Sequence, residues 1–189
     1  MTPQEYFLVK LAELKAWKAH HGQKRKGSGE PYFSHPEAVA RLVRLGGGDS
    51  FAIAAAWLHD VLEDTDETIT EFPEPVVNTV LKLTHKGDYE GAKMEAIEKL
   101  RGSKDALLIK LCDRFHNLTD CTGKQESYAN RPSVRKATAR LLQIADEYGL
   151  ADKKVYRRLT KLLEKIECRI EKGKRKKKPS RGSAGYGGC

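Results

Sequence analysis

The strongest chemical signal in the sequence is a group of titratable side chains at residues 59–64, at the end of an otherwise apolar stretch. His59 and Glu63 are four residues apart, as are Asp60 and Asp64, so a helix would bring each pair onto one face. Three carboxylates in one small volume repel one another unless a cation neutralises them or some of them bind protons. These residues are therefore candidates for metal binding or acid–base chemistry.

A structural interpretation of the same residues stays open at this point. Residues 63–66 could be a solvated helix end, and His59 could be a core histidine whose hydrogen bonds are satisfied within the protein. A His-Asp dipeptide is common by chance, so the dipeptide alone does not decide between the two interpretations.

Two further residues favour the chemical interpretation. His35 precedes Pro36 at the start of a predicted helix, and Asp113 interrupts an apolar helix. A carboxylate on a buried helix needs a partner of opposite charge or a hydrogen-bond donor. With His59 and Asp60 these residues supply two imidazoles and two carboxylates. This donor set suits Mn²⁺, Fe²⁺ or Zn²⁺ better than Ca²⁺, and a six-coordinate metal would keep positions for water and substrate.

The order of these motifs resembles the HD phosphohydrolase superfamily and, within it, the hydrolase domain of the RelA/SpoT proteins. The similarity lies in three segments, at residues 22–36, 55–65 and 110–118, and it extends over residues 5–145. The resemblance implies hydrolysis of the 3′-pyrophosphate of the guanine nucleotides ppGpp and pppGpp. It also implies a divalent metal cofactor, with Mn²⁺ as the expected ion.

The resemblance further implies roles for individual residues. The implied metal ligands are His35, His59, Asp60 and Asp113. The implied catalytic acids, which work on the attacking water, are Glu63 and Asp64. The implied substrate-binding residues are Arg25, Lys26, Ser28 and Asn117.

The sequence departs from the family pattern in two places. One residue is inserted after the basic pair, so Arg25 and Lys26 are alternatives for one role near the guanine and the phosphates. Thr119 and Asp120 stand where many long members of the family have Arg-Thr. Beyond residue 145 the chain has no room for the family's synthetase and regulatory domains, which predicts a stand-alone hydrolase unit.

Two other functions remain open on this sequence. The first is an HD-type nucleotidase or dNTP phosphohydrolase that acts on a different nucleotide. The second is a non-catalytic, basic-tailed module that binds nucleotides or nucleic acid and keeps its metal site for structure. The presence of Glu63 and Asp64 argues against the second function, because a purely structural metal site has no need of them.

The elements that position these residues are predicted to be helices, because apolar residues recur with a 3.6-residue period and no alternating strand pattern appears. Residues 50–63 are apolar on most sides and predict a central, buried helix. Ser103 is expected to cap the helix that carries Asp113. In the first helix, five apolar residues fall on one face: Phe7, Leu8, Leu11, Leu14 and Trp17. The predicted fold is an all-α, HD-type helical domain.

Charge divides the chain into two parts. The net charge is +9, but seven of the positive charges lie within residues 172–181, and removing them leaves +2 for residues 1–171. We predict one folded domain over residues 1–170 and a disordered, basic tail over residues 171–189, which could contact nucleic acid weakly.

Composition also bounds the cellular context. No apolar run approaches the ~20 residues that span a bilayer, so no membrane partner is expected. No secretory signal is recognised, which predicts a cytoplasmic location. None of the four cysteines forms a C-x-x-C pair, which gives no support to a zinc ribbon or a redox motif.

Overall fold

The computed structural model describes residues 1–26, 28–85, 91–120 and 126–177 of the 189-residue chain. The prediction of an all-α fold is confirmed, since the described residues contain no strand and only an isolated bridge between Lys24 and Pro31. The helices are α1 (Pro3–Ala19), α2 (Ser34–Leu45), α3 (Ser50–Leu58), α4 (Val61–Asp64), α5 (Glu74–Leu83), α6 (Ala92–Glu98), α7 (Lys104–Thr119), α8 (Glu126–Ala129), α9 (Pro132–Glu147) and α10 (Lys154–Lys177).

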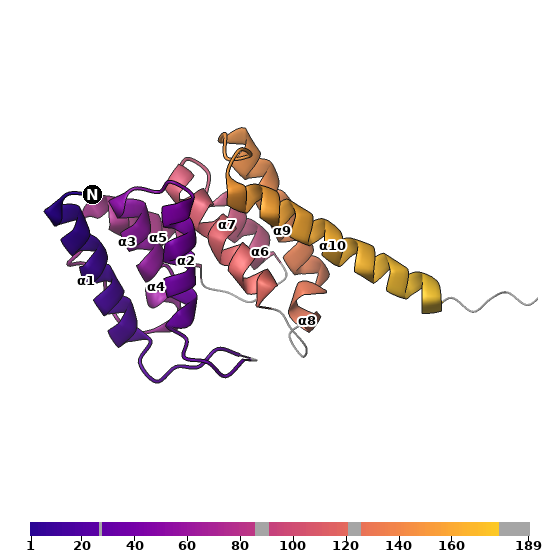
Figure 1. Cartoon of the computed structure of the whole chain (residues 1–189), viewed down its shortest axis with the longest axis horizontal. Helices are drawn as coiled ribbons and strands as arrows, with labels where there is room; N and C mark the ends of the chain where they lie inside the picture. Colours follow the sequence, from indigo (N-terminus) through magenta and orange to yellow (C-terminus); the bar gives the residue numbers. More distant parts are fainter. Residues whose placement is uncertain (27, 86–90, 121–125, 178–189) are drawn as a thin grey trace, which may run out of the picture.

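Two helices organise the packing. α3 contacts α1, α2 and α5, whereas α7 contacts α2, α3, α5, α9 and α10. Figure 1 shows α1 to α5 gathered on one side of the molecule and α6 to α10 on the other. α7 therefore connects the two groups, and a residue in its middle lies close to the centre of the fold.

The central helix is shorter than the sequence predicts. Asp49 caps the start of α3, because its side chain accepts a hydrogen bond from the Ala52 N–H at 2.8 Å, and the helix ends at Leu58. Asp60 has φ −100° and ψ −7°, and its carbonyl begins a new short helix by accepting from the Asp64 N–H. The prediction of one helix over residues 50–63 is wrong, because the helix is interrupted at His59 and Asp60 before α4 begins.

α7 is a buried helix with a polar interruption. Its predicted cap is confirmed, because the Ser103 side chain accepts a hydrogen bond from the Ala106 N–H at 3.2 Å. Leu107 and Leu111 are fully buried in the core, and Asp113 is only 5% exposed. A carboxylate is thus held within the core by a helix most of whose buried residues are apolar.

α1 packs against the core through small residues. A capping box at Thr2 begins the helix, and Val9, Ala12 and Ala16 are its buried residues. Phe7 and Trp17 lie on the outer side instead, with exposed fractions of 69% and 49%. Small side chains allow α1 to approach α3 closely, so the larger apolar residues of α1 face outward.

The last helix, α10, packs on the body along one face. Val155, Leu159, Leu163 and Ile166 recur every three or four residues and are buried, and α10 contacts α7 and α9. Figure 1 shows the rest of α10 projecting beyond the other helices. The predicted boundary at residue 170 falls inside this helix, and residues 178–189 of the predicted tail lie outside the described residues.

Among the described residues, no helix combines the length and the apolarity that crossing a bilayer requires.

Candidate metal centre and active site

Three separate segments bring four polar side chains together in the core. His35 comes from the start of α2, His59 and Asp60 from the break between α3 and α4, and Asp113 from the middle of α7. His35 Nε2 lies 3.3 Å from Asp113 Oδ1 and 3.5 Å from Asp60 Oδ2. His59 Nε2 lies 3.2 Å from Asp60 Oδ2. The donor atoms of His35, His59 and Asp113 all lie within 4.8 Å of one another, which makes this cluster a possible metal site.

The hydrogen bonding of His59 aims one ring nitrogen into the cluster. His59 Nδ1 donates to the Ala56 carbonyl at 2.8 Å, because a carbonyl can only accept. In the neutral ring the lone pair is therefore on Nε2, which is buried and makes no hydrogen bond with any described residue. Burial lowers the pKa of His59, but Asp60 and Asp113 outweigh burial and raise it to about 9. The cluster thus favours a positive charge at this point.

The two aspartates remain carboxylates although they are buried. Burial raises the pKa of Asp60, but His59 and His35 overcome this effect and hold the pKa below its usual value. Burial acts in the same direction on Asp113, where Lys110 and His35 hold the pKa well below its usual range. Two carboxylates and two imidazoles with inward nitrogens fit a divalent cation, and the absence of thiolate among them argues against a structural zinc site.

His116 supports His35 from α7, a role that the sequence analysis did not assign. The two Nδ1 atoms lie 2.9 Å apart. Burial, His35 and Arg25 lower the pKa of His116 to about 4, so its ring is neutral near pH 7 and its Nδ1 can accept a hydrogen bond from the His35 Nδ1–H. This arrangement leaves His35 Nε2 directed at the carboxylates. The signal in the sequence was the spacing of three residues between Asp113 and His116.

Two further residues hold the carboxylates in place and were also missed. Lys110 Nζ lies 2.9 Å from Asp113 Oδ2. The Tyr32 hydroxyl lies 2.7 Å from Asp60 Oδ2 and 2.8 Å from Asp64 Oδ2, so it can donate to either carboxylate. Lys110 was detectable as the residue one helical turn before Asp113, whereas nothing in the sequence places Tyr32 beside Asp60.

Three members of the cluster, His35, Asp60 and Asp113, line a cavity of about 610 Å³. Both acidic and cationic side chains line this cavity. The lining residues are Lys26, Tyr32, His35, Asp60, Glu63, Asp64, His85, Lys93, Ala96, Ile97, Lys110, Asp113, Arg114, Asn117 and Tyr128. A cavity with both signs of charge suits an anionic ligand that is bound together with a cation.

Glu63 lines this cavity, and its pKa is raised above the usual value for a glutamate. Burial raises its pKa, against the effects of His85 and Lys110. Its Oε2 lies 3.3 Å from His85 Nδ1. A carboxylate with a raised pKa is a better proton acceptor than an ordinary surface glutamate, so Glu63 has the properties of a general base.

The four predicted substrate-binding residues are not equivalent in the structure. Lys26 and Asn117 line the cavity, whereas the lining includes neither Arg25 nor Ser28. Ser28 is exposed, and its hydroxyl accepts from the Glu30 N–H at 3.4 Å.

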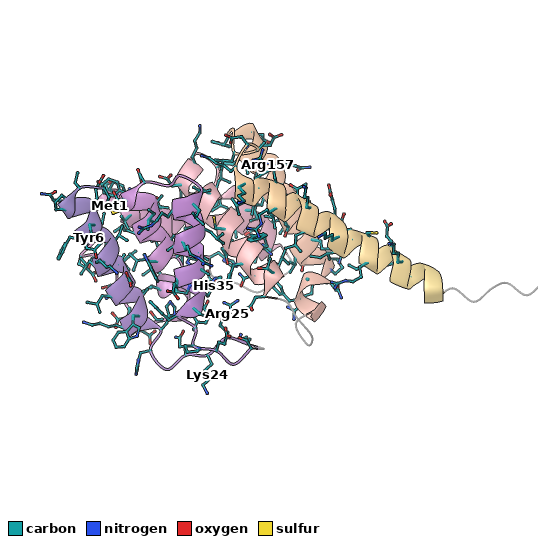
Figure 2. The ribbon with its side chains drawn as sticks, in the orientation of Figure 1. Met1, Tyr6, Lys24, Arg25, His35 and Arg157 are labelled. Atoms are coloured by element: carbon teal, nitrogen blue, oxygen red, sulfur yellow. The ribbon has the colours of Figure 1, made fainter. Side chains whose placement is uncertain are left out.

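Arg25 is held by residues at the end of α7. Its Nε lies 2.9 Å from Asp120 Oδ2, and its Nη2 donates to Asn117 Oδ1 at 3.1 Å. Figure 2 shows Arg25 on the side of the loop nearer His35, with Lys24 pointing away from the body. Asp120, which departs from the family pattern, is therefore the residue that pairs with Arg25. Of the two basic residues, Lys26 is the one that lines the cavity.

The fold and the buried His-Asp cluster agree with a family-level match. Residues 12–143, well over half of the chain, match the family model described as an HD domain. The chain belongs to the HD domain family.

Individual relatives narrow the similarity further. A Synechocystis protein named probable guanosine-3′,5′-bis(diphosphate) 3′-pyrophosphohydrolase is 40% identical over 111 residues, which are 52% of this chain and 15% of that protein. A GTP pyrophosphokinase of Streptomyces antibioticus is 36% identical over 136 residues, which are 66% of this chain and 16% of that protein. The chain thus spans only a small part of the length of the curated relatives it matches.

Solved structures of similar length share the fold. A metazoan ortholog of SpoT, described as hydrolysing ppGpp, superposes with a TM-score of 0.69 at 24% identity, covering 84% of this chain and 94% of that one. A protein of Listeria monocytogenes EGD-e superposes with a TM-score of 0.60 at 26% identity, covering 74% of this chain and 99% of that one. In both comparisons the superposition covers nearly the whole of the other chain, so the helical fold is shared over almost its full length.

Proposed function

We propose that this chain is a metal-dependent pyrophosphohydrolase that removes the 3′-pyrophosphate of guanine nucleotides such as ppGpp and pppGpp. The observation that carries the proposal is that one cavity brings together a His-Asp cluster, a glutamate with a raised pKa and several cationic side chains. The activities for which the Synechocystis relative and the SpoT ortholog are named support the choice of nucleotide. A cytoplasmic location, where guanine nucleotides are made and used, belongs to the same proposal.

The proposed metal ligands are His35, His59, Asp60 and Asp113, and the proposed ion is Mn²⁺. Mixed nitrogen and oxygen donors support this choice, since they suit Mn²⁺ and related ions. When bound there, a divalent cation would lower the pKa of a water molecule and polarise a phosphoryl oxygen.

The chain's own residues supply the remaining chemistry. Glu63 accepts a proton from the attacking water, whose oxygen forms a bond to the phosphorus attached to ribose O3′. The O3′–P bond breaks, pyrophosphate leaves, and the proton passes to the 3′-oxygen to give a hydroxyl. Asp64 helps to orient the water, while Lys26 and Arg114 neutralise phosphate charge. Asn117 contacts the nucleotide and also donates to Asp113.

A panel of nucleotides tests the proposal. Metal-loaded protein is incubated with ppGpp, pppGpp, GTP and the four dNTPs, and the products are separated by anion exchange. GDP and pyrophosphate from ppGpp support the proposal. Inorganic triphosphate and a deoxynucleoside from a dNTP would support the alternative HD-type dNTP phosphohydrolase. No turnover of any nucleotide, with binding retained, would support a non-catalytic module.

Replacing Tyr32 by phenylalanine should weaken metal binding or turnover by roughly 10–100-fold, the usual effect of losing a hydrogen bond to a metal ligand. The change removes only the hydroxyl that lies 2.7 Å from Asp60 Oδ2. Metal titration and kcat on the same sample measure the effect. Tyr6→Phe is the matched control, because Tyr6 is 57% exposed and distant in sequence from the site. Equal metal affinity and kcat in both variants would remove Tyr32 from the site.

Replacing Lys26 by alanine should raise KM for the nucleotide roughly 10-fold with a smaller change in kcat, since one charge-assisted contact to phosphate is lost. Both lysines are exposed, but Lys26 lines the cavity, whereas Lys24 on the same loop does not and points away from the body (Figure 2). Lys24→Ala is therefore the control and should keep the parent KM. If the two variants have the same KM, Lys26 does not contact the phosphates.

A further inference from the structure

Most of the exposed basic residues of α10 lie on one side of the helix. At 3.6 residues per turn, seven of them fall within a sector of about 120°, and Lys174 lies outside it. We call this set the basic stripe; its members are Lys154, Arg157, Arg158, Lys161, Lys165, Arg169 and Lys172. The described acidic residues of α10 are Glu164, Glu167 and Glu171, and helical geometry places all three outside that sector.

The packing of α10 fixes the direction in which the basic stripe faces. Leu159 and Leu163 lie on the opposite side of the helix and are buried against the body. At the start of the stripe the Arg158 guanidinium lies over the Phe115 ring, 4.8 Å from its centroid. Figure 2 marks Arg157 near the beginning of α10, and the helix continues outward from there. Apart from Arg158, which lies against Phe115, the basic stripe therefore lies on the side of α10 opposite its buried residues.

The dimensions of the stripe match a regular anionic polymer. From Lys154 to Lys172 the axial distance is about 27 Å at 1.5 Å per residue. Double-stranded DNA carries one negative charge per about 1.7 Å of axis, so a duplex laid along the stripe offers many phosphates to each cation. Seven like charges on one face repel one another in the free protein, and a line of phosphates would relieve this repulsion.

We propose that the basic stripe of α10 binds the phosphate backbone of double-stranded nucleic acid without reading its sequence. None of the seven residues lines the cavity of the proposed active site, so this surface is separate from it. A membrane is a poorer fit, because an interfacial helix inserts its apolar face into lipid and the apolar face of α10 is packed against the body. The sequence continues the positive charge at residues 174–178 and 181.

Two full-length triple variants with the same change in net charge test the proposal. The stripe variant carries Lys161→Gln, Lys165→Gln and Lys172→Gln. The control carries three exposed substitutions elsewhere, Arg41→Gln, Arg44→Gln and Lys104→Gln. Fluorescence anisotropy with labelled 20-bp DNA and RNA duplexes gives Kd between 50 and 200 mM salt.

The parent should bind a duplex. In the stripe variant the slope of log binding constant against log salt concentration should become less steep by about 2.7, because three phosphate contacts are lost at about 0.9 each. Its Kd at 100 mM salt should rise at least roughly 10-fold on the same grounds, while the control stays near the parent. A lower Kd for one of the two duplexes would show whether the stripe binds DNA or RNA. Hydrolysis of a small nucleotide should be unchanged in both variants, so the result does not depend on the proposed function.

Three outcomes would overturn the proposal. The first is no binding of either duplex by the parent at 50 mM salt. The second is equal weakening in the two variants, which would indicate a general effect of net charge. The third is binding of phosphatidylserine vesicles but not of duplexes, which would assign the stripe to a lipid surface. All substituted residues are exposed, so the midpoint of thermal unfolding should be unchanged in both triple variants. A double variant, Lys154→Gln with Arg157→Gln, repeats the binding test at the other end of α10.

Discussion

Replacing Glu63 by glutamine should lower kcat by roughly 10²–10⁴-fold, the usual contribution of a general base, while bound metal and KM stay close to the parent values. The substitution keeps the size of the side chain and removes its capacity to accept a proton. Glu63 lines the cavity beside the His-Asp cluster, but the proposed ligand set does not need it. Metal content and kcat are measured on the same preparation.

Glu67→Gln is the matched control for this experiment. Glu67 is an exposed acid that pairs with Lys15 at 2.6 Å on the surface, so the same chemical change there should leave kcat unaltered. An unchanged kcat in Glu63→Gln would rule out the general-base role. Loss of metal from Glu63→Gln would instead make Glu63 a ligand and require a different donor set.

Replacing His59 by alanine should strip the metal and reduce turnover to the background rate. The imidazole supplies a buried nitrogen, Nε2, whose orientation is fixed by the hydrogen bond from Nδ1 to the Ala56 carbonyl. Loss of one ligand removes both a donor and the geometry that depends on it. Elemental analysis after gel filtration and a ppGpp turnover assay measure the two effects.

His21→Ala provides the comparison, because His21 is exposed and contacts only the Trp17 ring among the ring contacts of the described residues. A second variant, Asp60→Asn, keeps the side-chain volume and guards against a folding defect in His59→Ala. One equivalent of metal retained in both His59→Ala and Asp60→Asn would show that the proposed ligand assignment is wrong.

The members of the cluster could be identified from the sequence, but the residues that support them largely could not. His59, Asp60 and Asp113 stood out because each places a polar group against an apolar helix, and burial forces such a group to find a partner. His35 stood out by its position before Pro36, at the start of a predicted helix. Tyr32 gave no such signal, since its hydroxyl reaches Asp60 across 28 residues of sequence through a loop whose path no periodicity determines. Long-range contacts made by loops are set by the finished fold.

The same distinction applies to the helices. Periodicity and caps predicted most of them, including the helix that Ser103 caps, because these signals are local. In α1, however, Phe7 and Trp17 are exposed although they are among its largest apolar residues. A helix that is apolar on two faces does not indicate which face is inward, and here the close packing of small residues against α3 decided it.

The proposed ligand positions come from three parts of the chain, at residue 35, residues 59 and 60, and residue 113. Their donor atoms approach one another only because α2, α3 and α7 pack around one core. A fragment that ended before α7 would contain three of the four positions and no assembled centre. For a cooperatively folding domain, activity would then be an all-or-none property of each molecule. A half-unfolded preparation would hold half the number of intact centres, each with its full activity.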